Sequence, residues 1–135
     1  MPTKNKTSKP IKSKPPANAL YRSRIEICRI LRELVRGKHQ VFAEIDFDKS
    51  LTTRILHVDE RSGYLVVGYG DSKRMNSVLF DYSVLQYRAN YRGAHLFFKL
   101  SNPLECLHEG KHAIKFDLPD ALLWSQRREV ERVVG

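Results

Sequence analysis

The sequence has 135 residues, 41% hydrophobic and 29% charged, a length and balance that suit one packed domain and exclude two. Its formal net charge is +9, but residues 1–19 carry five lysines and no acidic residue, so the rest of the chain carries only +4. The basic character therefore resides half in one terminal segment and does not by itself predict a nucleic-acid-binding domain. There is no run of ~18 apolar residues and no apolar stretch of signal-peptide type, so we expect a cytoplasmic protein without a membrane span.

The first segment is rich in lysine and proline. Residues 1–19 contain four of the six prolines and a single large aliphatic residue, Ile11. Such a segment buries too little apolar surface to offset the loss of chain entropy, so we predict that residues 1–20 form a disordered basic tail. Two roles are open for it: electrostatic attachment to an acidic partner, nucleic acid or anionic lipid, or simple solubilisation, which we favour.

A helix is predicted over residues 23–36. Ser23 and Glu26 have the spacing of a capping box, and the helix should end at Gly37 in a left-handed conformation. One face of it carries apolar residues at helical spacing: Ile27, Ile30, Leu31 and Leu34.

After Gly37 the hydrophobic period changes to two, which is typical of half-buried strands. The dipeptide Arg92-Gly93 has the character of a tight hairpin turn. Residues 70–77 are polar and loop-like, residues 78–84 suit either a short strand or a connector, and residues 101–111 suit a loop. The predicted strands are residues 41–47, 51–58, 64–69, 85–91, 94–100 and 112–118.

These elements predict a mainly β fold: a small antiparallel, split β-barrel of about six strands, with one N-terminal helix that covers or plugs one end. Gly68 and Gly93 supply curvature signals within the strands. We assign residues 21–120 to this domain and residues 121–135 to a linker segment.

Enzyme motifs are not found. The run Gly68-Tyr69-Gly70 lacks the third glycine and the following helix of a dinucleotide fold, and the chain has neither a P-loop nor a nucleophile elbow. His57 lies mid-strand, where a structural or exposed histidine is the simplest interpretation. We therefore predict a protein that is not an enzyme.

A metal site is also not favoured. Cys106, His108 and His112, with two glutamates nearby, are suitable ligand types, but their spacing matches no closed zinc site, and we interpret the segment as a polar loop. Two cysteines, Cys28 and Cys106, are too few for a disulfide scaffold, so both should be reduced thiols.

Single-stranded nucleic acid is the alternative ligand. Tyr87, Arg88, Tyr91, Arg92 and His95 interleave aromatic and basic side chains, as such binding requires. Strand alternation, however, places both tyrosines on the face of Leu85 and Ala89, which suits a core.

The C-terminal arginines are the most informative feature. Arg128 and Arg132 are four residues apart, which places them on one side of a strand or a helix, and Arg127 adds a third positive charge. Paired guanidiniums bind phosphates bidentately, contact guanine O6 and N7, or stack on a purine. On spacing alone, a solvated segment partly neutralised by Glu129 and Glu131 is the simpler interpretation.

The order of elements resembles the N-terminal domain of the YcgR-type flagellar brake family, which precedes a PilZ domain. The resemblance spans about residues 22–132. It rests on the T-x-x-L-x-V-D run from Thr53 to Asp59 and on the LP…QRR…R run from Leu118 to Arg132, along with the segments IEICRILRELV, QYRANYRGAHLFFKL and DLPDALLWSQRREVER.

The resemblance implies a PilZ-like β-barrel whose terminal RxxxR motif wraps around cyclic di-GMP, with Arg128 and Arg132 as the motif and Arg127 beside it. The family's second signature, (D/N)-x-S-x-x-G, lies in the PilZ domain and is not matched by the segments at Asp71 or Asn76. This chain should therefore hold half of a cyclic di-GMP site and bind weakly alone.

The implied function is a non-enzymatic signalling module whose partner is the flagellar motor or switch, located in the cytoplasm or at the basal body. The resemblance implies no cofactor beyond this ligand. The alternative, from another class, is a basic β-barrel that binds single-stranded nucleic acid. The sequence does not indicate an oligomeric state.

Overall fold

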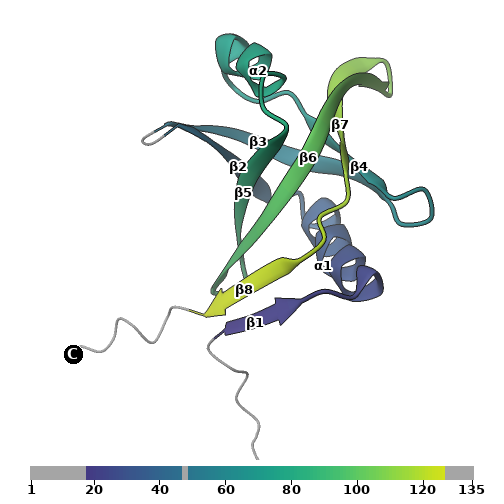
Figure 1. Cartoon of the computed structure of the whole chain (residues 1–135), viewed down its shortest axis with the longest axis vertical. Helices are drawn as coiled ribbons and strands as arrows, with labels where there is room; N and C mark the ends of the chain where they lie inside the picture. The colour runs from purple at the N-terminus through teal and green to yellow at the C-terminus, as the bar shows by residue number, and fades with distance from the viewer. Residues whose placement is uncertain (1–17, 47–48, 127–135) are drawn as a thin grey trace, which may run out of the picture.

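The computed structural model describes residues 18–46 and 49–126, and this part of the chain is mainly β with two helices (Figure 1). All strand pairs are antiparallel. The elements in chain order are β1 (Asn18–Tyr21), α1 (Arg24–Arg36), β2 (Gln40–Asp46), β3 (Lys49–Asp59), β4 (Tyr64–Gly68), α2 (Lys73–Leu79), β5 (Val84–Tyr91), β6 (Ala94–His108), β7 (Lys111–Asp117) and β8 (Leu122–Gln126).

Six of the strands form a ring-like sheet. Their order is β6-β5-β2-β3-β4-β7, and β7 pairs back onto β6, which confirms the predicted mainly β fold with about six strands in the ring. The two remaining strands, β8 and β1, extend from the first half of β6. Figure 1 places α2 at one end of the ring and α1, β8 and β1 toward the other.

Helix α1 forms as the sequence predicts. The Ser23 hydroxyl accepts a hydrogen bond from the Glu26 backbone N–H, and the apolar face is buried at Ile27, Cys28, Ile30, Leu31 and Leu34. The expected left-handed end at Gly37 is wrong: Gly37 has φ −85°, and Lys38 has φ 54°. A Cβ at residue 37 would lie 2.5 Å from Nε2 of His39, so a larger residue there requires the imidazole to move.

Helix α2 is absent from the sequence prediction, which placed a loop at residues 70–77 and stated that no helix follows Gly70. The helix begins three residues after Gly70, and its N-cap Ser72 accepts a hydrogen bond from the Met75 N–H. The Asn76 side chain ties it back by accepting from Gly70 N–H and donating to Gly70 O, at 2.7 and 3.2 Å. These tertiary bonds stabilise a helix too short to form alone.

Strands β1 and β8 include residues that were predicted to lie outside the folded domain. Residues 18–20 were assigned to the tail and residues 122–126 to the linker, but they pair with each other, and β8 also pairs with β6. Leu122 is fully buried, and Tyr21 and Trp124 pack against the core. Each segment is too short to show a strand pattern in the sequence, and its strand depends on pairing with a segment distant in the chain.

The core holds one polar group without a hydrogen-bond partner among the described residues, the Tyr87 hydroxyl. The Tyr87 ring is fully buried between Phe98 and Phe116, with ring centroids 6.0 and 5.7 Å away. Burial raises the pKa of this phenol, which keeps it protonated. The ring stabilises the fold while its hydroxyl adds an unsatisfied polar atom.

We therefore predict that Tyr87→Phe leaves the free energy of unfolding unchanged or raises it by about 1 kcal/mol, because no hydrogen bond is lost. Tyr87→Ala should lower it by about 3–5 kcal/mol through the cavity that it creates. Urea denaturation followed by circular dichroism measures both. A loss of more than about 1 kcal/mol in the phenylalanine variant would show that the hydroxyl makes a stabilising bond.

Candidate functional site

The end of strand β8 determines where the arginine segment leaves the sheet. Gln126 is paired with Ala94 at the start of β6, and Ser125 is paired with Asn18 at the start of β1. Strand β1 therefore begins, and β8 ends, at the same end of the sheet, as Figure 1 shows. Arg127, Arg128 and Arg132 lie outside the described residues, but Arg127 follows directly on the residue opposite Ala94.

Aromatic and basic side chains surround this exit. Arg92, at the tip of the β5–β6 turn, has its guanidinium carbon 5.2 Å from the centroid of the Tyr91 ring. The Tyr91 ring meets Trp124 of β8 edge-on, with centroids 6.0 Å apart, and contacts His39 in the same manner at 5.3 Å. The turn itself uses positive φ at Arg92 (53°) and Gly93 (77°), the geometry of a two-residue hairpin.

A hollow of about 420 Å³ lies between the end of α1 and this turn. Its charged side chains are two arginines, Arg36 and Arg92, and one carboxylate, Glu33. Glu33 is held by two neighbours: Arg36 Nη2 lies 2.8 Å from it, and the Tyr91 hydroxyl donates to it at 3.3 Å. The exit thus carries forked cations, which suit an anionic ligand.

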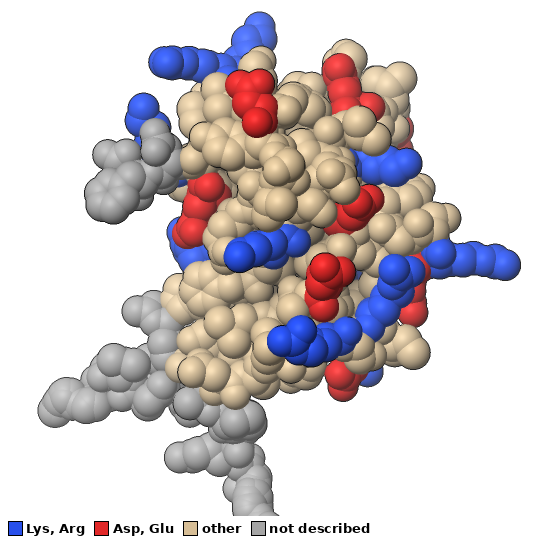
Figure 2. Space-filling model, viewed as in Figure 1, with Lys and Arg blue, Asp and Glu red and all other residues tan. Residues whose placement is uncertain are grey.

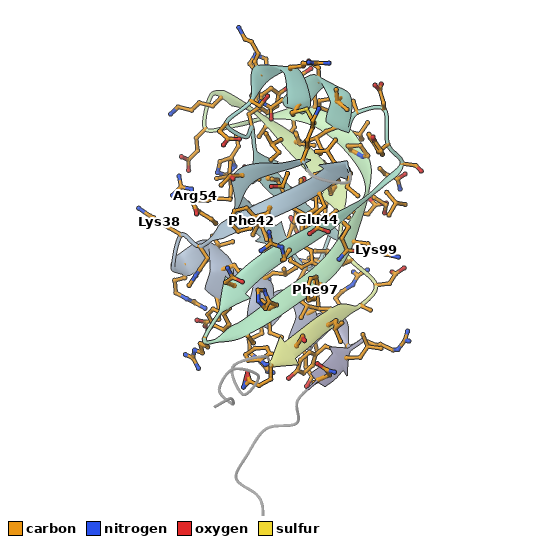
Figure 3. All side chains as sticks on the ribbon, turned by 90° about the vertical axis from the view of Figure 1, so that its left-hand side faces the viewer. Lys38, Phe42, Glu44, Arg54, Phe97 and Lys99 are labelled. Carbon is orange, nitrogen blue, oxygen red and sulfur yellow. The ribbon has the colours of Figure 1, made fainter. Side chains whose placement is uncertain are left out.

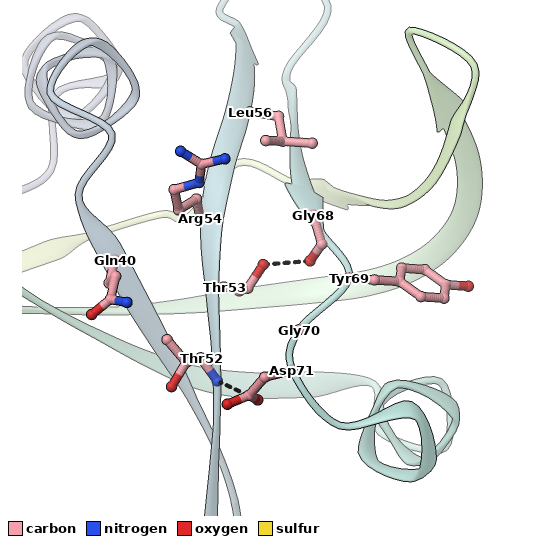
Figure 4. Close-up of a pocket in the computed structure, with 9 residues that line it drawn as sticks. All are labelled: Gln40, Thr52, Thr53, Arg54, Leu56, Gly68, Tyr69, Gly70 and Asp71. Atoms are coloured by element: carbon pink, nitrogen blue, oxygen red, sulfur yellow. Dashed lines mark hydrogen bonds between the residues drawn. The ribbon is translucent and has the colours of Figure 1, made fainter.

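A second hollow, of about 430 Å³, contains the Gly68-Tyr69-Gly70 run (Figure 4). The Thr53 hydroxyl donates to Gly68 O, and the Thr52 N–H donates to the Asp71 carboxylate at 3.4 Å. A Cβ on Gly70 would lie 2.3 Å from the Leu51 side chain, so this glycine serves close packing. The run spans the end of β4 and the start of its connection to α2.

The hairpin tyrosines do not form an exposed aromatic surface. Tyr87 and Tyr91 are 0% and 9% exposed and point into the core, as strand alternation predicted. Figure 2 shows acidic and basic side chains interspersed on the face viewed there, without a continuous basic surface. Neither observation favours the nucleic-acid interpretation.

The cysteine–histidine segment is not the predicted loop. Residues 101–108 continue β6, and the turn to β7 lies at Glu109 and Gly110, both with positive φ. Because side chains alternate along a strand, Cys106 and His108 share one face, whereas His112, opposite Leu107, lies on the other. His112 Nδ1 is 2.8 Å from the Glu105 carboxylate. The described residues contain no cluster of three potential metal ligands.

Both cysteines are free thiols in the structure, as predicted. Burial raises the pKa of each thiol, so both favour the protonated form. Within the described residues, no helix is long and apolar enough to cross a membrane.

Residues 20–124 match the family model described as "Flagellar regulator YcgR, PilZN domain". The chain belongs to this family. Its sequence is 33% identical over 114 residues to flagellar brake protein YcgR 1 of Paraburkholderia phytofirmans, covering 83% of this chain and 43% of that protein. The chain also spans less than half the length of the other YcgR relatives that it matches.

Solved structures support the same fold. The YcgR-N domain of Escherichia coli YcgR superposes with a TM-score of 0.70 at 16% identity, covering 78% of this chain and 93% of that domain. Escherichia coli YcgR in complex with c-di-GMP gives 0.72 at 18% identity, covering 81% of this chain and 47% of that protein. At these identities the likeness concerns the fold, and it confirms the predicted PilZN-like domain.

The pairing of β1 with β8 leads to a prediction about truncation. Deleting residues 1–17 of this PilZN domain should leave the stability unchanged, because the lysine- and proline-rich sequence of this segment offers little apolar surface to bury. Deleting residues 1–21 should lower the free energy of unfolding by about 1–3 kcal/mol, because it removes β1 and the packed Tyr21 side chain. Chemical denaturation of the two truncated proteins compares them, and equal stabilities would show that β1 does not support β8.

Proposed function

We propose that this chain is a non-enzymatic regulatory module of the flagellar brake type, and that it contributes part of a cyclic di-GMP site. Family membership supports the regulatory role. The register of β8 carries the proposal for the site, because Gln126 opposite Ala94 starts the arginine segment beside Arg92 and Tyr91. In this role the chain binds a signal and a partner protein and makes or breaks no covalent bond.

The arginines are well suited to this ligand. Two guanidiniums four residues apart can each take a phosphate bidentately, or one can stack on a guanine while the other holds the phosphate. The structure of Escherichia coli YcgR in complex with c-di-GMP is among the fold's relatives, which makes cyclic di-GMP the ligand to test first. Arg128 and Arg132 are the principal contacts in this proposal, and Arg127 is an additional cation.

The chain supplies only part of the site. A segment that must lose backbone and side-chain entropy to bind a ligand binds weakly unless a second surface holds it in place. A PilZ domain that follows the arginine segment would provide that second surface and the remaining ligand contacts. The flagellar motor or its switch is the proposed protein partner of the completed receptor.

Cyclic di-GMP titrations of this chain alone, and of the chain joined to a PilZ domain, test the proposal. The joined protein should bind at least tenfold more tightly, and Arg128→Ala or Arg132→Ala should each weaken its binding at least tenfold, since each removes a charge-assisted contact. Trp124 fluorescence reports binding, because this residue lies in β8 close to the motif. Calorimetry checks the affinity independently.

Two controls accompany this titration. Arg74→Ala removes an exposed arginine of α2 at the opposite end of the fold and should change nothing. Deletion of residues 1–17 should also preserve binding, because the lysines there are not ligands in this proposal. If the joined protein does not bind cyclic di-GMP, or if its arginine variants bind normally, the proposed site is wrong.

A further inference from the structure

The outer face of the sheet carries a continuous row of side chains that the proposed dinucleotide site does not use. Register pairs Phe42 of β2 with Arg88 of β5, Arg88 with Phe97 of β6, Phe97 with Leu123 of β8, and Leu123 with Leu20 of β1. Side chains that are directly opposite each other project from the same face of a sheet. The row therefore crosses five strands on the side away from the core.

Side chains in this row contact one another and their neighbours, so the row is not a set of isolated apolar residues. The Arg88 guanidinium carbon lies 4.7 Å from the centroid of the Phe42 ring, and its Nε lies 3.4 Å from the Glu44 carboxylate. Phe42, Arg88, Phe97 and Leu123 are half-buried, and Leu20 is 52% exposed. Phenylalanine and arginine are both enriched in protein interfaces relative to the rest of the surface.

A groove of about 970 Å³ lies along the β6–β8–β1 part of the row. Leu118 and Pro119 are buried in it, and Val84, 49% exposed, stands beside it. The apolar residues that line it are Leu20, Val84, Phe97, Leu118, Pro119 and Leu123. An apolar groove of this size on a sheet face can receive the side chains of a partner.

Charged side chains of opposite sign lie beside different parts of the row. Figure 3 shows Lys38 and Arg54 on one side of Phe42 and Lys99 close to Phe97, all on the same face, with Glu44 among them. These three cations are exposed, and Glu44 is already paired with Arg88. Asp71, which accepts from the Thr52 N–H, lines a hollow together with Arg54, and Asp117 and Asp120 lie at the far end of the groove. A complementary partner is therefore acidic over most of its length and basic at one end.

We propose that this outer face binds an amphipathic helix of a partner protein, with an apolar stripe in the groove and acidic residues facing Lys38, Arg54 and Lys99. Five strands at a spacing of ~4.8 Å give the row a length of about 19 Å. A helix rises ~1.5 Å per residue, so about 13 residues cover the row with anchors three or four positions apart. A basic residue near Asp120 fixes the direction of the helix, because the reverse orientation places like charges together.

This inference rests on the proposed function only for the source of the helix, which is then expected to be the flagellar switch. The surface chemistry is tested without that assumption by two synthetic helices with identical leucine stripes. One carries glutamate beside the stripe, and its twin carries lysine at the same positions. Fluorescence anisotropy of the labelled peptides at low ionic strength measures their binding to the full chain, and amide chemical shifts locate it.

The glutamate helix should bind at least tenfold more tightly than its lysine twin and shift amides of β2, β5, β6 and β8. Phe97→Ala and Lys99→Glu should each weaken binding at least tenfold. The matched controls are Leu107→Ala and Lys111→Glu, which change exposed residues near the β6–β7 turn and should leave binding within twofold. Circular dichroism verifies that each variant is folded, and Lys99→Glu tests the face with least risk to packing because its side chain is exposed.

Several results would overturn the proposal: no binding of the glutamate helix, equal binding of the twins, or equal losses in the control variants. A concentration-dependent dimer that Leu20→Lys abolishes would overturn it too, by assigning the face to a second copy of the chain. Arg128→Ala should bind the helix normally, so that failure of the dinucleotide site and failure of this surface give different results. If both peptides fail but the arginine variants lose cyclic di-GMP, the site stands and the surface does not.

Discussion

The architecture depends on strand β6 changing its neighbour halfway along its length. Its first half pairs with β8 and its second half with β7, and the register shifts between Ser101 and Leu104. Asn102 adopts φ 59°, and Pro103 offers no N–H to a ladder, so the change falls where regular pairing cannot continue. The Asn102 N–H donates to Ser83 O at 2.9 Å, and its side chain donates to Asp117 at 2.6 Å. The ring therefore closes through β7, while β8 and β1 remain as a separate extension.

This junction also explains which parts of the fold could be predicted from the sequence. The predicted strands at residues 41–47, 64–69 and 85–91 appear with small changes of boundary. The first and third alternate between the core and the outer face, whereas the second is a short apolar run with three consecutive buried residues. Asn102-Pro103 suggested a loop, whereas it forms an irregularity within a longer strand. Strands β1 and β8 are short and lack an alternating hydrophobic sequence pattern. They are held by pairing of β8 with β6, by pairing with each other and by core packing of Leu122, Tyr21 and Trp124. Helix α2 likewise depends on contacts with Gly70 that are remote from its own pattern.

The candidate site also has one part that the sequence indicates and another that only the folded structure brings together. The arginine motif is visible in the sequence through its family resemblance, whereas its spacing alone favoured a solvated segment. Arg36 and Tyr91 near the exit could not be assigned to it, because their position depends on which strand lies beside which. A hairpin turn such as Arg92-Gly93 can be predicted from the local sequence. That it lies next to the end of β8 follows only from the pairing of Ala94 with Gln126.

Strand β8 connects the two proposed surfaces through the alternation of its side chains. Leu122 and Trp124 point inward, where Trp124 meets Tyr91, while Leu123 lies in the outer row beside Phe97. Arg128 follows Gln126 by two positions, so a ligand held by that arginine acts on a strand of five residues that also forms part of the groove. The strand has partners on both edges, β6 and β1, which resist its displacement. A signal bound at the exit and a partner bound on the outer face thus share one short structural element, which is a physical requirement for coupling between them.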